Sequence, residues 1–128
     1  MTSKERFHLR PDGEKAFGYA QAVKVSDWLH LAGLLSVDDA FTPIDVGDME
    51  AQIGNVYDAI ARTLAAHGLA MSDIVKETVF VTDMDAFLAA NARRIAAYGG
   101  ALPAATAVEV KRLAFAECMI EIEVIAAF

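Results

Sequence analysis

The chain has 128 residues, of which 55% are apolar and 23% charged, and its formal net charge is -7. This length suits a single domain spanning 1–128, and so high an apolar content excludes a disordered chain. The negative charge, which no dense cluster of lysine and arginine offsets, argues against nucleic acid as a partner.

The first predicted elements form a β-hairpin. Tyr19–Val25 is rich in small and β-branched residues, and a second apolar run, Trp28–Leu35, follows after only Ser26 and Asp27. Two turn-type residues between two such runs are typical of a hairpin.

A long amphipathic helix follows a loop over Phe41–Gly47. Asp48 can cap its N-terminus. One face is apolar at steps of three and four residues, at Met49, Ile53, Val56, Ile60 and Leu64. Gly68 suits the end of this helix, and for His67 beside it we expect a structural role at the helix C-terminus rather than a catalytic one.

The remaining elements are a strand, a helix and two strands. Ile74–Thr82 is dense in β-branched residues, with Ile74, Lys76, Thr78 and Phe80 predicted on one face and Val75, Glu77, Val79 and Val81 on the other. A second helix over Phe87–Tyr98 ends at Gly99-Gly100. Two last strands, Ala105–Lys111 and Cys118–Ala126, then form a final pair.

This order of elements favours an α+β fold in which both helices lie together on one face of one sheet. The polar N-terminus lacks the apolar run of a secretory signal, and no stretch approaches the ~20 apolar residues of a membrane span. The single cysteine, Cys118, cannot form an internal disulfide, and its flanks are typical of a strand interior. We therefore expect a cytoplasmic protein with no membrane partner and a buried, inert thiol.

The last strand carries the clearest candidate for chemistry. Glu121 and Glu123 lie two residues apart, so their carboxylates point the same way, about 6.5–7 Å apart. Because Met119 and Ile125 make this face partly apolar, a carboxyl group here would have a raised pKa, which suits acid/base work. The alternative is that this face of the sheet is exposed to solvent and that Glu121 and Glu123 are ordinary surface residues. Glu109 would lie close by if the last two strands pair, or would face solvent.

Other catalytic patterns are not found. The sequence has no glycine-rich phosphate loop, no nucleophile elbow and no histidine and cysteine set with metal-ligand spacing. His8 and His30 stand alone. We therefore expect neither a metal nor a cofactor.

Five segments together resemble the Rid/YjgF family, which is also described as enamine/imine deaminases and as the endoribonuclease L-PSP family. They occur in the family's order and spacing: Tyr19-Ala-Gln-Ala-Val23, Leu29-His-Leu-Ala-Gly33, Asp73-Ile-Val-Lys-Glu-Thr-Val-Phe-Val-Thr-Asp83, Pro103-Ala-Ala-Thr-Ala-Val-Glu-Val110 and Ile120-Glu-Ile-Glu-Val-Ile-Ala126. The resemblance covers essentially the whole chain.

The resemblance implies a chorismate-mutase-like fold, with one mixed, mostly antiparallel sheet and two helices on one face. It also implies a homotrimer with three clefts between subunits. Family members typically hydrolyse reactive enamines or imines to ketones and ammonia. In these proteins an arginine clamps the substrate carboxylate, a role that suits a guanidinium group because it binds carboxylates bidentately. A glutamate positions water, a role that suits a desolvated carboxylate because it can relay protons.

Residue by residue, the resemblance makes Glu121 the water-positioning glutamate, Tyr19 the cleft tyrosine and Asn91 the helix asparagine. Each also has a structural alternative: strand surface for Glu121, aromatic packing for Tyr19 and a helix-surface amide for Asn91. The expected substrate-binding set is completed by Leu34, Ala105 and Thr106.

The chain departs from the family pattern in two places. Ala105 stands where the family's arginine would follow Pro103-Ala104, so the carboxylate clamp is missing. Ala32-Gly33-Leu34-Leu35-Ser36 replaces a Ser-Gly-Gln-Ile-Pro run, which makes that wall more apolar. A less charged, more apolar ligand is therefore expected.

Two functions follow from the resemblance. One is a deaminase or related hydrolase or lyase acting on a small, relatively apolar nitrogen-containing metabolite. The alternative is a metabolite-binding or regulatory trimer that has lost catalysis with its arginine. A third reading, the RNA cleavage from which some members of the family took their names, is disfavoured by the acidic charge.

Overall fold

A sheet of seven strands organises the protein, whose computed structural model describes residues 2–128. The strands are β1 (Lys4–Phe7), β2 (Ala22–Val25), β3 (Trp28–Leu31), β4 (Leu34–Leu35), β5 (Ile74–Val81), β6 (Ala104–Glu109) and β7 (Ile120–Ala127). The helices are α1 (Pro11–Phe17), α2 (Met49–Ala65), the 3-10 turn η1 (Met71–Asp73), α3 (Met84–Ala89) and α4 (Asn91–Tyr98).

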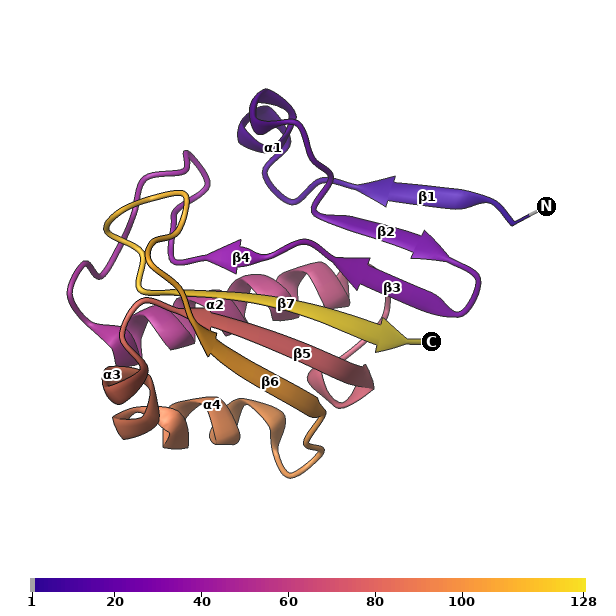
Figure 1. Cartoon of the computed structure of the whole chain (residues 1–128). Helices are drawn as coiled ribbons and strands as arrows, with labels where there is room; N and C mark the ends of the chain where they lie inside the picture. The colour runs from indigo at the N-terminus through magenta and orange to yellow at the C-terminus, as the bar shows by residue number, and fades with distance from the viewer. Residues whose placement is uncertain (1) are drawn as a thin grey trace.

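The strands are ordered β1-β2-β3-β7-β5-β6, and the short β4 also pairs with β7. All neighbours are antiparallel except β5 and β6. The predicted mixed, mostly antiparallel sheet is thereby confirmed, as is the α+β class. Figure 1 shows β7 running through the middle of the sheet, with α2 behind it and α3 and α4 beside β6.

The predicted pairing of the last two strands is wrong. Helices α3 and α4 return the chain so that β6 lies parallel to β5, and β7 then takes the opposite side of β5. Strand β5 therefore separates β6 from β7. Glu109, at the end of β6, accepts a hydrogen bond from the backbone N–H of Met84 at 2.9 Å and so serves the start of α3.

The amphipathic pattern of α2 is confirmed. Asp48 caps the helix by accepting from the backbone N–H of Ala51 at 3.0 Å. The apolar face of α2 packs onto alternate residues of β7, and the two sets form the centre of the core: Ile53, Val56, Ile60 and Leu64 from α2, with Ile120, Ile122 and Val124 from β7. The other face of β7 is thereby turned away from α2.

The second predicted helix is divided. It begins at Met84 rather than Phe87, and α3 and α4 are separated at Ala90. Asp83 caps α3 by accepting from the backbone N–H of Ala86 at 3.0 Å. Gly99 ends α4 in the left-handed conformation, with φ of 56°.

The face assignments of Ile74 and Val75 on β5 are also wrong, and Val75 is 42% exposed rather than buried beside Glu77 and Val79. The pairing with β7 shifts between Ile74 and Lys76, so Val75 is bulged. Ile74 therefore lies in the core at 4% exposure and does not share a face with Lys76.

Strand β1, helix α1 and the 3-10 turn η1 were not predicted from the sequence. Strand β1 pairs with β2 at the edge of the sheet, and α1 connects β1 to β2. Pro11 at the first turn and Gly18 with φ of 91° are the ordinary boundary signals of a helix, here framing only seven residues. Figure 1 shows that α1 lies apart from the layer of α2, α3 and α4.

A buried ion pair fixes α4 against the sheet. Glu77 on β5 is fully buried, and the Arg94 guanidinium on α4 donates to its Oε2 through Nε at 2.9 Å and Nη2 at 2.6 Å. Tyr57 on α2 donates its hydroxyl to the other oxygen of the same carboxylate. Arg94 is therefore committed to an internal partner. Within residues 2–128, no helix has the length and apolar character needed to cross a membrane.

Candidate functional site

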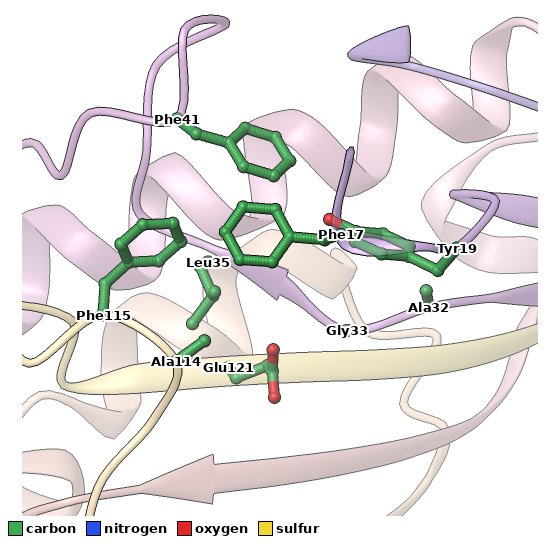
Figure 2. A pocket seen from close by; sticks show the side chains of 9 residues that line it. All are labelled: Phe17, Tyr19, Ala32, Gly33, Leu35, Phe41, Ala114, Phe115 and Glu121. Carbon is green, nitrogen blue, oxygen red and sulfur yellow. The ribbon is translucent and has the colours of Figure 1, made fainter. Parts of the chain in front are cut away.

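A cavity of about 200 Å³ opens on the side of the sheet away from α2. It is lined by Phe17, Tyr19, Ala32, Gly33, Leu35, Phe41, Ala114, Phe115 and Glu121. Figure 2 shows the Glu121 carboxylate pointing from β7 toward a group of aromatic rings. Tyr19 and Glu121, both expected site residues, therefore line one cavity.

Glu121 reaches the cavity because of the alternation along β7. Its neighbours Ile120 and Ile122 are fully buried on the helix side, so its own side chain points the other way. Burial raises the pKa of Glu121 above its ordinary value, and the charge of Glu123 on the same face raises it further. This environment makes the carboxyl group able to hold or release a proton nearer neutral pH.

Gly33 provides the space that Glu121 occupies. A Cβ atom at Gly33 would lie 2.7 Å from Cγ and Cδ of Glu121 and 2.9 Å from Oε2. Non-bonded atoms do not approach each other this closely. Any larger residue at Gly33 would therefore displace the Glu121 carboxyl group. The backbone of Gly33 is not left-handed, and the requirement for glycine is therefore purely steric.

Tyr19 follows α1 at the edge of the same cavity. Burial raises its pKa, and the negative charges of Glu14 and Glu121 add to that effect while Arg10 opposes it. The hydroxyl therefore stays protonated over the physiological range and can donate a hydrogen bond to a ligand.

Three phenylalanines that sequence reasoning missed close the cavity. Phe17 comes from α1, Phe41 from the loop before α2, and Phe115 from the loop between β6 and β7. They follow no helical or strand periodicity. The available signal was weak: Phe41 lies in the segment predicted as a loop and Phe115 lies between the two last predicted strands, and polar residues are more usual in such positions.

The other expected site residues lie in a second recess. Asn91, Ala105 and Thr106 line a space of about 190 Å³ between α3, α4 and β6, together with Arg94. Leu34 lines neither recess, because its side chain is 2% exposed and belongs to the core. Its neighbours Gly33 and Leu35 contact the first cavity instead.

Metal-binding groups and the cysteine add nothing to the cavity. Over the part of the chain from residue 2 onward, no three His, Cys, Asp or Glu side chains converge as metal ligands would. Cys118 is buried and burial raises the pKa of its thiol, with a weak contact from Sγ to the Ser36 carbonyl at 3.8 Å. The cavity therefore offers one carboxyl group, one phenol and apolar surface.

The sequence model of the family described as Endoribonuclease L-PSP matches residues 11–128. A RutC family protein of Pyrococcus horikoshii is 37% identical over 108 residues, which cover 84% of this chain and 85% of that protein. The 2-iminobutanoate/2-iminopropanoate deaminase of Escherichia coli is 34% identical over 111 residues, with coverage of 84% and 85%.

A solved structure is similar over nearly all of the chain. It is a member of the YjgF family from Mycobacterium tuberculosis, with a TM-score of 0.85 and 25% identity, and the alignment covers 98% of this chain and 100% of that one.

We expect Gly33→Ala to lower the free energy of unfolding by about 1–3 kcal/mol, because the added methyl group overlaps Cγ and Cδ of Glu121. In a Glu121→Ala background those two atoms are gone, so the same change should cost much less. Denaturant unfolding of the four proteins in this cycle measures the coupling. Gly54→Ala is the matched control, because its new methyl group meets only the flexible end of Arg93 and should act independently of Glu121. If Gly33→Ala lowered the free energy of unfolding equally in both backgrounds, Gly33 would not be the residue that makes room for Glu121.

Glu121→Gln should stabilise the protein increasingly as pH rises. The pKa of Glu121 is raised in the folded state, so its contribution to stability is complete below the unfolded pKa of about 4.3 and is lost as pH rises through the folded value. Glutamine has no ionisation and escapes this loss. Melting temperatures of both proteins, compared near pH 4 and at neutral pH, should coincide more closely at the acidic end. A difference that does not change with pH would place the carboxylate in open solvent, and the opposite trend would mean that folding lowers its pKa.

Proposed function

The chain belongs to the Endoribonuclease L-PSP family, that is, the Rid/YjgF family, and we propose that it hydrolyses the C=N bond of a small, relatively apolar imine, or of the imine tautomer of an enamine. The observation that carries this proposal is the Glu121 carboxyl group, whose pKa is raised in a largely apolar cavity beside a phenol. The name of the Escherichia coli relative, an iminobutanoate deaminase, supports the same reaction class.

The proposed reaction consumes one water and releases ammonia. The water oxygen bonds to the imine carbon while Glu121 takes one of its protons, and the π electrons of the C=N bond move to nitrogen. Protonated Glu121 returns this proton to nitrogen, which gives a neutral carbinolamine. Glu121 then takes the hydroxyl proton and delivers it to the same nitrogen, so the C–N bond breaks, the C=O bond forms and ammonia leaves. Tyr19 donates a hydrogen bond that orients the polar end of the substrate.

The charges around the site favour a substrate without a carboxylate. The nine lining residues of the cavity include no lysine, arginine or histidine, while Glu121 itself is acidic. The one cation among the residues that line the second recess, Arg94, is already paired with the buried carboxylate of Glu77. Ala105 supplies no charge. A carboxylate group would therefore lose hydration without gaining a cationic partner.

We further propose that the protein forms a homotrimer in which the two recesses face each other across subunit boundaries. The support is that neither recess holds all the expected site residues and that every residue of the edge strand β6 is exposed. Apolar side chains near this edge are also exposed, among them Leu88, Leu102 and Val108. An unpaired edge with apolar surroundings is typical of a surface that another chain covers.

Sedimentation equilibrium should give a mass three times the 13.7 kDa of one chain. Val108→Lys, which places charge on β6, should weaken the assembly, while Val46→Lys, at an equally apolar exposed position in the loop before α2, should not. A stable monomer at micromolar concentration would contradict the trimer.

A second candidate function is binding without catalysis. Ala105 favours it, because the family resemblance places the carboxylate-clamping arginine there. Such a protein would bind a metabolite saturably and release no product. The two functions are separated by whether ammonia forms.

A matched pair of imines tests the hydrolase. 2-Iminobutanoate and its carboxylate-free counterpart propan-1-imine are generated by oxidases from 2-aminobutanoate and propan-1-amine, and semicarbazide traps whatever imine remains. We expect this protein to suppress semicarbazone formation from propan-1-imine more strongly than from 2-iminobutanoate. Glu121→Gln should reduce the enzymatic rate by roughly 10²–10⁴-fold, the usual contribution of an acid/base group.

Ala105→Arg serves as the control for charge, since it should shift the preference toward 2-iminobutanoate without altering Glu121. Acceleration that persists in Glu121→Gln would remove the proposed mechanism. No acceleration with either imine, combined with saturable binding, would select the second function.

A further inference from the structure

Three phenylalanine rings form a wall opposite Glu121. The ring centroids of Phe17 and Phe41 are 5.6 Å apart, those of Phe17 and Phe115 are 5.9 Å apart, and those of Phe41 and Phe115 are 6.2 Å apart. All three rings therefore contact one another, in tilted and edge-to-face arrangements that aromatic groups favour. Figure 2 shows them gathered on one side of the cavity, with the Glu121 carboxylate on the other.

The backbone at Phe41 is held in an unfavourable conformation. Its φ is 61°, a left-handed value that bulky residues adopt only when their surroundings impose it. Asp38 imposes it, because its Oδ1 accepts from the backbone N–H groups of Ala40 and Thr42, both at 2.9 Å. Such strain at a residue lining a cavity is typical of a functional position.

Helix α1 is shaped to receive the Phe41 ring. A Cβ atom at Gly13 would lie 3.0 Å from three atoms of this ring, so only glycine lets the ring lie so close to the helix. Phe17, at the end of the same helix, also packs against Phe41, with the two ring planes tilted by 31°.

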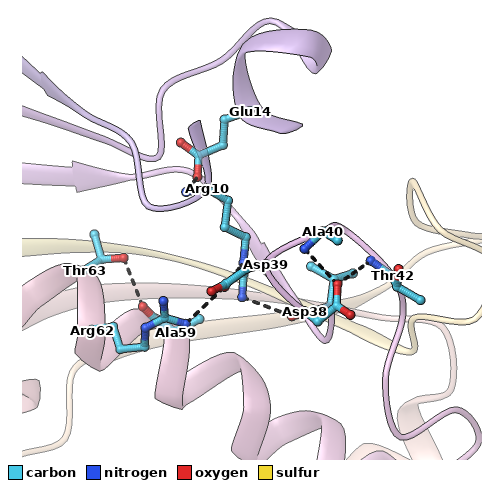
Figure 3. Close-up of polar contacts among 10 residues, drawn as sticks. Arg10, Glu14, Asp38, Asp39, Ala40, Thr42, Ala59, Arg62 and Thr63 are labelled. Carbon is cyan, nitrogen blue, oxygen red and sulfur yellow. Dashed lines mark hydrogen bonds and ion pairs between the residues drawn. The ribbon is translucent and has the colours of Figure 1, made fainter. Parts of the chain in front are cut away.

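Arg10 ties α1 to the loop that carries Phe41, as Figure 3 shows. The buried guanidinium donates to the Val37 carbonyl at 3.0 Å and to Asp39 at 3.2 Å. The backbone N–H of Arg10 donates to the fully buried carboxylate of Glu14 in α1 at 2.6 Å. The wall is therefore assembled before any ligand arrives, which lowers the entropy cost of binding.

The wall remains incompletely covered in the protein alone. Phe17 is 61% exposed, and the cavity of about 200 Å³ separates the rings from Glu121. An apolar cavity of roughly 150 Å³ lined by similar residues suffices to hold a benzene molecule. The space is therefore large enough for a ring-sized apolar group in contact with the phenylalanines.

We infer that Phe17, Phe41 and Phe115 select an imine or enamine that carries an aryl group close to its C=N bond. This inference rests on the proposed function and specifies its substrate class. The reacting carbon lies at Glu121, and the aryl group packs on the wall. An anionic substituent is disfavoured there, because the cavity presents the Glu121 carboxylate and apolar surface in place of a cation.

The test compares two imines that differ only in this substituent. 2-Phenylethan-1-imine and propan-1-imine are generated by an amine oxidase from 2-phenylethylamine and propan-1-amine, with semicarbazide as the trap. We expect kcat/KM for the aryl imine to exceed that for propan-1-imine by at least roughly tenfold, the scale of discrimination by an apolar pocket. Phe115→Ala and Phe17→Ala should each reduce this ratio toward one, because each removes part of the surface on which the aryl group packs.

Phe128→Ala is the matched control, because Phe128 is also an exposed phenylalanine but stacks with Lys24 at the chain end, outside the cavity. It should leave the ratio intact. Loss of both activities together in Phe115→Ala and Phe17→Ala would indicate a merely structural role and overturn the inference. So would equal hydrolysis of the two imines by the parent protein, which would leave the proposed function standing.

Calorimetric binding of phenylacetamide and propanamide, stable amides of similar shape to the two imines, gives a readout independent of turnover. Phenylacetamide should bind the parent protein more tightly, and Phe115→Ala should remove the difference. If neither imine is hydrolysed but this preference holds, the proposed hydrolase fails and the aryl-selective wall stands. If the two amides bind alike, the wall does not select aryl groups.

Discussion

The cavity depends on the alternation of side chains along β7. Ile120 and Ile122 are fully buried beneath α2, so Glu121 between them has to point to the opposite face. A shift of one residue in the pairing would carry this carboxylate into the core and both isoleucines into solvent, at a large cost in free energy. The same packing that stabilises the sheet therefore holds the acidic group in place, and Gly33 leaves the room it needs.

Local patterns made much of this predictable from the sequence. The apolar spacing and the Asp48 cap located α2, the turn residues located the β2–β3 hairpin, and the period of two placed Glu121 away from the core. Each of these signals lies within a few neighbouring residues. The raised pKa of Glu121 also followed from its apolar flanks, because burial is its main cause.

What could not be predicted depends on contacts between distant segments. The sequence does not show that β5 separates β6 from β7, since both pairings suit strands of their composition. Leu34 was expected at the site, yet three residues separate His30 from Leu34 where only two separate their partners on β7, so Leu34 lies in the core while Gly33 and Leu35 line the cavity. The phenylalanine wall was missed because its members come from three unrelated segments.

The origin of the wall in α1 and two loops has an evolutionary consequence. These segments lie outside the layer of sheet and helices that forms the central core, so substitutions in them leave the packing under Glu121 intact. Loops tolerate changes in length and sequence far better than buried strands do. Descendants of one ancestral protein can therefore acquire different ligand preferences by exchanging aromatic residues at the rim, while inheriting the same proton-transfer group.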